Sequence, residues 1–277
     1  MKCLVTGASG FIGRELCRQL PARGATVAQT GREPPSRAQL AGVAIVYHAA
    51  GIAHRSADPA DYQTCNYRAT LDLAHRAADA GVQRFVFLSS VNAGEAAEPY
   101  GYWKWRTEQA LLSAYAEGAM SVVILRPALV YGPGARGNLQ LLIKAVRRGL
   151  PTPPAGKSRS MISVEDLCDA LCRIADVDPG RGVILTATDG QSYDLQRLHR
   201  AFALALGRRP SRPWLPLWCW WAASLGADLL RRRRPGDLYT RLFDGALFSN
   251  QRLCDALGWV PRQRLEDVAG DMVGEGA

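Results

Sequence analysis

The chain has 277 residues, enough for one large domain or for one domain with a smaller second lobe. Its hydrophobic content of 48% and its charged content of 21% are ordinary for a soluble globular protein. The net charge of +9 suits a phosphate-bearing ligand, and because no nucleic-acid-binding motif accompanies it, we expect no nucleic-acid partner.

The seven cysteines are dispersed and form neither a Cys-x-x-Cys pair nor a cysteine–histidine cluster at metal spacing. We therefore expect no metal site and reduced, mostly buried thiols, as in a cytoplasmic protein. The N-terminus enters an apolar segment at once, so we expect no signal peptide.

Apolar segments alternate with helical patterns through the first half of the chain. In chain order the sequence predicts a strand at 2–5, a helix at 11–20, strands at 26–30 and 43–48, a helix at 61–80, a strand at 84–88, a helix at 100–117 and a strand at 121–125. Continuous apolar strands that alternate with helices indicate an α/β fold, in which helices cover both faces of a parallel sheet.

After Pro127 glycine and proline become dense, and helices dominate. The predicted elements are helices at 139–148 and 164–175, a strand at 183–187 and a helix at 195–206. We expect a sheet domain over residues 1–130 and a smaller, mostly helical lobe over residues 131–277, interleaved with the sheet domain.

A tryptophan-rich segment, residues 213–221, leads into residues 222–230 and then into four consecutive arginines. Its apolar run is interrupted by Pro216 and is short for a membrane span. Two hypotheses remain: a buried helix of the smaller lobe, or a peripheral membrane contact with tryptophans at headgroup depth and arginines on lipid phosphates.

Gly7, Gly10 and Gly13 are spaced three apart, directly after the first strand and at the head of the first helix. In such a loop the first glycine permits the tight turn, the second lets backbone approach a pyrophosphate, and the third lets the helix pack on the sheet. The free N–H groups of the helix N-terminus favour phosphate. The sequence therefore predicts a dinucleotide site in a Rossmann-type, doubly wound sheet.

Three polar residues later in the chain complete a pattern for hydride transfer. Tyr100 and Lys104 are four apart in a predicted helix, so they share one face. The lysine charge would lower the phenol pKa, and a tyrosine tuned in this way can exchange a proton with a sugar hydroxyl. Ser90 can hold the carbonyl oxygen from the opposite side. We predict Ser90, Tyr100 and Lys104 as catalytic residues.

The choice between the two nicotinamide dinucleotides depends on the end of the second strand. An acidic residue there would bind the ribose diol of NAD. Here the strand is followed by Arg32, which can hold the 2′-phosphate of NADP, and then by Glu33. We favour NADP(H), with NAD(H) as the alternative.

These motifs resemble those of the extended short-chain dehydrogenase/reductases, in particular the NAD-dependent epimerase/dehydratase family and its UDP-sugar 4-epimerase and 4-ketoreductase branch. Residues 6–13 resemble its cofactor loop, residues 48–51 its strand end beside the cofactor, and residues 125–134 its strand and loop over the nicotinamide. Asn66 matches the asparagine that opens its central helix. The resemblance implies cofactor contacts at Gly7, Ser9, Gly10, Phe11, Ile12, Gly13, Arg32, Ala49, Ala50, Tyr100, Lys104 and Pro127.

The later part of the chain resembles the substrate-binding lobe of the same family. Asn138 resembles an asparagine that touches the substrate diphosphate, and Arg159 resembles an arginine that pairs with it. Arg234 and Arg241 are rival candidates for a second such arginine, because the guanidinium fork binds phosphate oxygens in pairs. With Ser90, these are the predicted substrate-binding residues.

The sequence departs from the family at two places. Only ten positions separate Ser90 from Tyr100, where relatives have a longer loop, and residues 32–43 are too few for the usual helix, strand and helix. We therefore expect one edge strand to be missing. These departures concern the substrate pocket and leave the hydride-transfer residues intact.

The resemblance implies reduction of a 4-keto nucleotide sugar by NADPH, most plausibly a UDP-linked deoxy or N-acetyl hexose for a surface polysaccharide. One alternative is a UDP-sugar 4-epimerase with tightly bound NAD, which uses the same three residues. Another is a non-catalytic nucleotide-binding protein on the same fold. A further hypothesis is that two copies of the chain form a homodimer.

Overall fold

The computed structural model describes the chain except for residues 32, 53–57, 211, 231–233 and 275–277. The chain forms two compact units. Unit 1 consists of residues 1–128, 164–187 and 250–260, and unit 2 of residues 129–163, 188–249 and 261–277. The chain therefore passes between the units several times, and residues 164–187 and 250–260 return to the first.

Unit 1 is built on a six-stranded, fully parallel sheet in the order β2-β1-β3-β4-β5-β8. The chain moves outward from β1 to β2 and then in the other direction through the remaining strands, so the order reverses beside β1. Ligands of such sheets bind where the order reverses, at the carboxyl ends of the strands. The strands are β1 Lys2–Thr6, β2 Thr26–Thr30, β3 Ile45–His48, β4 Arg84–Leu88, β5 Ser121–Pro127 and β8 Val183–Ala187.

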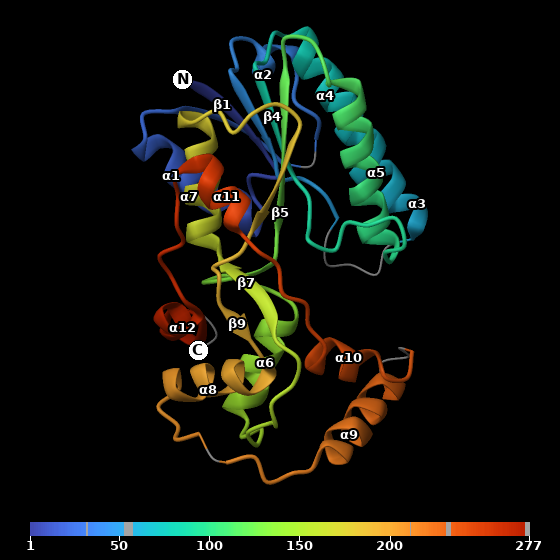
Figure 1. The fold of residues 1–277 in the computed structure, drawn as a ribbon, viewed down its shortest axis with the longest axis vertical. Coiled ribbons are helices and arrows are strands. Elements are labelled where there is room, and N and C mark those ends of the chain that lie inside the picture. Colours follow the sequence, from blue (N-terminus) through green and yellow to red (C-terminus); the bar gives the residue numbers. More distant parts are fainter. Residues whose placement is uncertain (32, 53–57, 211, 231–233, 275–277) are drawn as a thin grey trace. The chain divides into compact units, whose positions relative to one another are not determined.

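Helices cover both faces of this sheet (Figure 1). Helices α1 (Phe11–Ala22) and α7 (Val164–Asp176) pack together on one face, and α4 (Ala69–Asp79) and α5 (Pro99–Ala114) pack together on the other. Unit 1 also contains α2 (Arg37–Leu40), α3 (Pro59–Tyr62) and α11 (Gln251–Leu257). The α/β, Rossmann-type fold expected from the sequence is confirmed.

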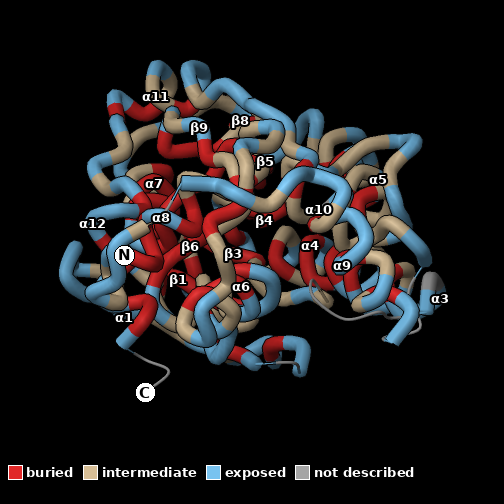
Figure 2. Tube along the Cα trace, turned by 90° about the horizontal axis from the view of Figure 1, so that it is seen from below, coloured by how far each residue is buried: buried red, intermediate tan, exposed pale blue. Residues whose placement is uncertain are grey.

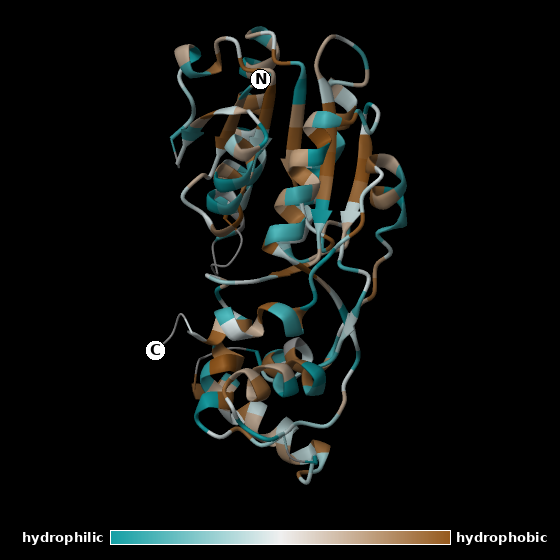
Figure 3. Cartoon of the chain, turned by 90° about the vertical axis from the view of Figure 1, so that its left-hand side faces the viewer, coloured by the Kyte–Doolittle hydropathy of each residue, from teal (hydrophilic) through white to brown (hydrophobic). Residues whose placement is uncertain are grey.

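The inner strands β1, β3, β4 and β5 are apolar along most of their length because both of their faces are covered. Val5, Val46, Phe85, Val86 and Ile124 are fully buried. The burial of the strands can be followed in Figure 2, and their continuous hydrophobic colouring in Figure 3. This pattern made the sheet predictable, since an amphipathic strand would have alternated.

Unit 2 contains a three-stranded sheet and five helices in its described residues. Its strands have the order β6-β7-β9 and span Leu129–Tyr131, Arg159–Ser163 and Ser192–Tyr193. The helices are α6 (Asn138–Arg147), α8 (Leu195–Ala205), α9 (Leu217–Leu230), α10 (Asp237–Phe243) and α12 (Leu265–Gly274).

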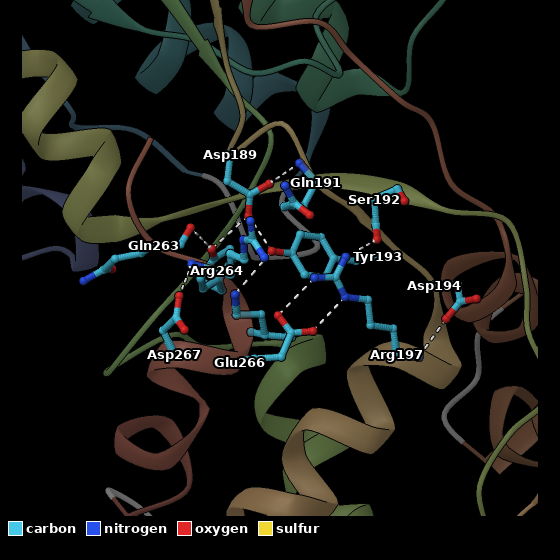
Figure 4. A network of polar contacts seen from close by, with 12 residues as sticks. Asp189, Gln191, Ser192, Tyr193, Asp194, Arg197, Gln263, Arg264, Glu266 and Asp267 are labelled. Atoms are coloured by element: carbon cyan, nitrogen blue, oxygen red, sulfur yellow. Dashed lines mark hydrogen bonds and ion pairs between the residues drawn. The ribbon is translucent and has the colours of Figure 1, made fainter. Parts of the chain in front are cut away.

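A polar network fastens the elements of unit 2 to one another (Figure 4). Tyr131 and Tyr193 each donate a hydroxyl hydrogen bond to the buried Asp189 carboxylate, at 2.8 and 2.7 Å. Arg197 of α8 forms a two-pronged ion pair with Glu266 of α12 and lies over the Tyr193 ring. These contacts are satisfied within the unit, so we assign them to the fold.

Two details differ from a simple pattern of strands and long helices. The helix expected at 61–80 is divided into α3, a π-helix η1 (Gln63–Arg68) and α4. The chain between β2 and β3 forms the short helix α2 in its described residues, so β2 lies at the sheet edge, as the short segment predicted.

Among the described residues, no helix is long and apolar enough to cross a membrane.

Candidate active site

The glycine loop after β1 is held against the end of β3 by backbone contacts. Gly7 has a φ of +66°, and a Cβ there would lie 2.8 Å from the Ala50 nitrogen. A Cβ at Gly13 would lie 2.1 Å from the Gly7 carbonyl oxygen. Any side chain at either position would displace backbone, so close approach requires both glycines, and the turn requires Gly7 in addition.

The loop and its surroundings fit a dinucleotide. Gly10 is the N-cap of α1 and has no side chain with which to cap the helix, so the first N–H groups of α1 are available to an anion. Close by, Ala8 donates its N–H to the Thr30 carbonyl at 3.1 Å. The Thr30 hydroxyl is buried and has no hydrogen-bond partner among the described residues, which suits a ligand hydroxyl at the end of β2.

Tyr100 lies in the first turn of α5 and shares a hydrogen bond with the Ser90 side chain. Burial raises the pKa of Tyr100 to about 12, the Ser90 hydrogen bond opposes that shift, and nearby Tyr62 adds to it. The Tyr62 ring stands edge-on, with its centroid 6.1 Å from that of Tyr100. Tyr100 is therefore protonated at neutral pH and can donate a proton.

Lys104 lies one turn further along α5 and is buried. Its Nζ donates a hydrogen bond of 2.7 Å to the Leu88 carbonyl and lies 4.5 Å from the centre of the Phe87 ring. Burial lowers the pKa of Lys104 to about 8, against the opposite influence of Glu108.

The expected lowering of the Tyr100 pKa by Lys104 is not observed. The lysine ammonium is directed at the end of β4, and desolvation dominates the phenol. Tyr100 is hydrogen-bonded to Ser90, and Lys104 contacts the Leu88 carbonyl two residues before it. The catalytic roles of the three residues stay a prediction.

Asn66 connects the chain after β3 with the surroundings of Lys104. It lies in the π-helix η1, where its Oδ1 accepts from the Ile52 N–H at 2.8 Å and its Nδ2 donates to the Ile52 carbonyl at 3.0 Å. A Cβ on Gly51 would lie 3.0 Å from Asn66 Oδ1 and 3.7 Å from Lys104 Nζ. The chain after β3 is thereby fixed beside Lys104, and π-helical turns are frequent at functional sites.

His48 is the centre of a buried chain of hydrogen bonds. The Thr70 hydroxyl donates to the Asn66 carbonyl at 2.8 Å, so it must accept from His48 Nε2–H, 2.9 Å away. Nδ1 then accepts from the Thr6 hydroxyl at 2.7 Å, and that oxygen lies 3.3 Å from the Ala50 N–H. Burial, assisted by Lys104, lowers the pKa of His48 to about 3, so the ring is neutral and its tautomer is set.

This chain of hydrogen bonds connects β1, β3 and the π-helix η1 close to the glycine loop. Sequence reasoning noted His48 only as part of a strand end. A polar residue that ends an otherwise apolar strand was the available signal, but its partners lie 22 and 42 positions away, and local pattern does not reveal them.

Gly101 explains how the ten-position interval from Ser90 to Tyr100 can close. A Cβ at Gly101 would lie 2.2 Å from the Asn92 carbonyl oxygen and 2.8 Å from Ala97 Cβ. The start of α5 therefore rests directly on the preceding loop. The sequence analysis did not single out Gly101, yet this residue positions the neighbouring Tyr100.

The remaining expected cofactor contacts lie around the same sheet edge. Ser9, Phe11 and Ile12 belong to the glycine loop and the start of α1, and Ala49 and Ala50 directly follow β3. Pro127 is the last residue of β5 and is buried. Arg32 lies outside the described residues.

The expected diphosphate ligands all belong to unit 2. Asn138 is the exposed first residue of α6, and Arg234 is exposed before α10. The side chain of Arg241 lies outside the described part of the chain. Arg159 begins β7 and donates from Nη2 to the carbonyls of Leu242 and Asp244, at 2.9 and 2.5 Å.

Arg159 therefore already contributes to the fold, and burial lowers its pKa against the influence of Asp244. Its Nε is buried without a hydrogen-bond partner in the described residues. Nη2 of Arg159 therefore holds the chain at Leu242 and Asp244, while its Nε keeps a donor that a ligand could use.

Comparison with known proteins places this site in context. The model of the NAD dependent epimerase/dehydratase family matches residues 3–184. A UDP-glucose 4-epimerase of Vibrio cholerae is 27% identical over 95% of this chain and 92% of its own. A UDP-2-acetamido-2,6-beta-L-arabino-hexul-4-ose reductase of Pseudomonas aeruginosa is 26% identical over 64% of this chain and 50% of its own. The solved structure of MoeE5 in complex with UDP-glucose and NAD superimposes with a TM-score of 0.77 at 25% identity, covering 100% of this chain and 98% of that one.

Proposed function

The chain belongs to the NAD-dependent epimerase/dehydratase family, and from that premise we propose that it reduces the 4-keto group of a UDP-linked sugar with NADPH. The observation that carries the proposal is the hydrogen bond between the Tyr100 phenol and the Ser90 side chain. Reduction of a ketone needs a proton donor at the oxygen, and this pair brings a donor and a second polar group together.

Each residue of the site has a distinct part in this reaction. Tyr100 donates its proton to the sugar oxygen, and Ser90, its hydrogen-bond partner, holds the same oxygen in place. Lys104, which is cationic below its pKa of about 8, donates to the Leu88 carbonyl and so keeps a positive charge at the end of β4, two residues before Ser90. The nicotinamide supplies the hydride when the cofactor is bound. Asn66 and His48 position the backbone around it.

The proposal also specifies NADPH as the cofactor and UDP as the nucleotide of the substrate. Arg32, which follows β2, favours the 2′-phosphate of NADPH, although MoeE5 was solved with NAD. The UDP moiety is supported by the relatives and structural neighbours, whose names and titles specify UDP-sugars. We assign diphosphate contacts to Asn138 and Arg159, with Arg234 and Arg241 as rival second arginines.

A UDP-sugar 4-epimerase is the second candidate, because the match to the Vibrio cholerae epimerase extends over 95% of this chain. One experiment separates the two. The absorbance of the freshly purified protein is recorded for bound nicotinamide, and the protein is then incubated with UDP-glucose alone or with a UDP-4-keto sugar and NADPH. Stoichiometric consumption of NADPH supports the reductase; copurified NAD with formation of UDP-galactose supports the epimerase. If neither occurs with a panel of UDP-sugars, the assignment to UDP-sugars is wrong.

A further inference from the structure

Helix α9 of unit 2 buries its polar residues and exposes large apolar ones. Its two buried polar residues are Ser224 and Asp228, whose exposed fractions are 4% and 1%. Trp218 is 69% exposed, Trp221 is 51% exposed and Leu229 is 79% exposed. A helix of a soluble protein normally buries its apolar stripe and exposes its polar face, so α9 presents an apolar stripe that the rest of the described chain leaves uncovered.

The buried face of α9 has a structural explanation. The Asp228 carboxylate accepts the N–H of Leu238 at the start of α10, at 3.2 and 3.1 Å. Trp220 packs edge-on against Phe243 of α10, with ring centroids 6.2 Å apart. The extensive contacts of α9 within the described chain are with α10, beside which it lies in Figure 1. These contacts fix which side of the helix faces outward.

Trp218 and Leu229 share that outward side. At 100° per residue they lie about 20° apart and about 80° or more from the buried Ser224 and Asp228, whereas Trp221 lies at the edge of this side, about 20° from Asp228. The stripe begins before the helix, since Trp214 is also exposed. Exposed residues of this region can be followed in Figure 2. Several large exposed apolar side chains on one segment are a feature of interaction surfaces.

Positive charge surrounds this apolar stripe in the sequence. Residues 208–234 contain seven arginines and one aspartate, a net charge of +6 in a chain whose total is +9. The aspartate is the buried Asp228, so no exposed acid offsets the arginines within this segment. Arg209 and Arg212 are exposed before α9, and residues 231–234 follow it directly.

From these observations we propose that α9, together with the exposed Arg209 and Arg212 that precede it, binds an anionic lipid surface. Tryptophan combines an apolar ring with a polar N–H and is enriched at the level of lipid headgroups, where arginine pairs with phosphates. The helix has 14 residues and is about 21 Å long, shorter than the roughly 30 Å of a hydrocarbon core. It therefore lies on the membrane and does not cross it.

A second copy of the chain fits this surface less well. In a twofold interface the same patch meets itself, so the positive charge of residues 208–234 would be brought together from both copies. Like charges in contact repel, whereas an anionic bilayer offers opposite charge along the whole length of the helix. Charge complementarity thus selects the lipid surface.

The test is cosedimentation of the full chain with vesicles of phosphatidylglycerol and phosphatidylcholine in equal parts, and with vesicles of phosphatidylcholine alone. We expect binding to the anionic vesicles that weakens at high salt. The double variant Trp218→Ser/Trp221→Ser should bind at least about tenfold more weakly. Arg209→Gln/Arg212→Gln should weaken binding to the anionic vesicles specifically.

Val260→Ser, which changes another exposed apolar residue, belongs to unit 1 and is the matched control; its binding should equal that of the wild type. All of the changed side chains are exposed, so the variants should fold, which their melting temperatures and their enzymatic activity without vesicles will check. Absent vesicle binding, or equal binding by the double tryptophan variant, overturns the proposal. So does dimerisation in analytical ultracentrifugation that the double tryptophan variant loses while vesicles go unbound, since the occupant is then a second copy.

Discussion

Replacement of Gly101 by alanine tests how the site is assembled. The new Cβ would lie 2.2 Å from the Asn92 carbonyl oxygen, a backbone atom that cannot rotate away. Overpacking of this kind costs about 1–3 kcal/mol, and so close a contact belongs at the upper end. Alanine recovers about 1 kcal/mol through its helix propensity. We therefore expect a net loss of about 2 kcal/mol in the free energy of unfolding.

The matched control is Gly270→Ala in α12, where a Cβ would meet nothing within 4 Å. That variant should gain about 0.5–1 kcal/mol, because the helix propensity acts alone. Urea denaturation of both variants measures the difference. Since a displaced α5 also moves Tyr100 away from Ser90, kcat of Gly101→Ala should fall at least about tenfold. A Gly101→Ala protein that is as stable as the Gly270→Ala protein would refute the close packing of α5 on its loop.

Four further outcomes follow from the site. Tyr100→Phe should lower kcat by about a hundredfold or more while cofactor affinity, measured by titration, changes within a few-fold; retained activity would remove Tyr100 from the reaction. Activity should fall as pH rises through about 8, because Lys104 loses its charge there, and a rate that is constant to pH 10 would contradict that role. His48 has its pKa lowered to about 3 from 6.5, so the unfolded chain binds the extra proton between these values, and stability falls as pH drops below 6.5. Between pH 7 and pH 5 the loss should reach about 2 kcal/mol, and His48→Gln should show a smaller loss in the same urea titrations. Arg32→Ala should weaken NADPH binding by roughly 1.5–3 kcal/mol and NADH binding far less, and equal effects would show that Arg32 does not contact the 2′-phosphate.

The parts of the site that were predictable from sequence depend on local spacing. Gly7, Gly10 and Gly13 are three apart after an apolar strand, and Tyr100 and Lys104 are one helical turn apart. Each pattern follows from the geometry of a single element, so its meaning does not require the fold. The continuous apolar strands likewise identified a sheet covered on both faces.

Other features depend on contacts between distant segments. The hydrogen-bond chain through His48 joins Thr6 to Thr70, and no local pattern connects them. The sequence led us to expect a low pKa for Tyr100, because the expectation considered the charge of Lys104 and left out the burial of the phenol, which raises the pKa. In α9 the apolar composition was evident, but which side faces outward depends on the position of α10.

The claim that Tyr100 and its partners carry hydride transfer on a UDP-sugar is tested most directly by isotope transfer. The protein is incubated with a UDP-4-keto sugar and NADPH deuterated at the transferable position, and the product is analysed by mass spectrometry. The proposed reaction incorporates one deuterium at C4 of the sugar with the wild type and almost none with Tyr100→Phe. A product without deuterium, or equal incorporation by Tyr100→Phe, would contradict the assignment of this site.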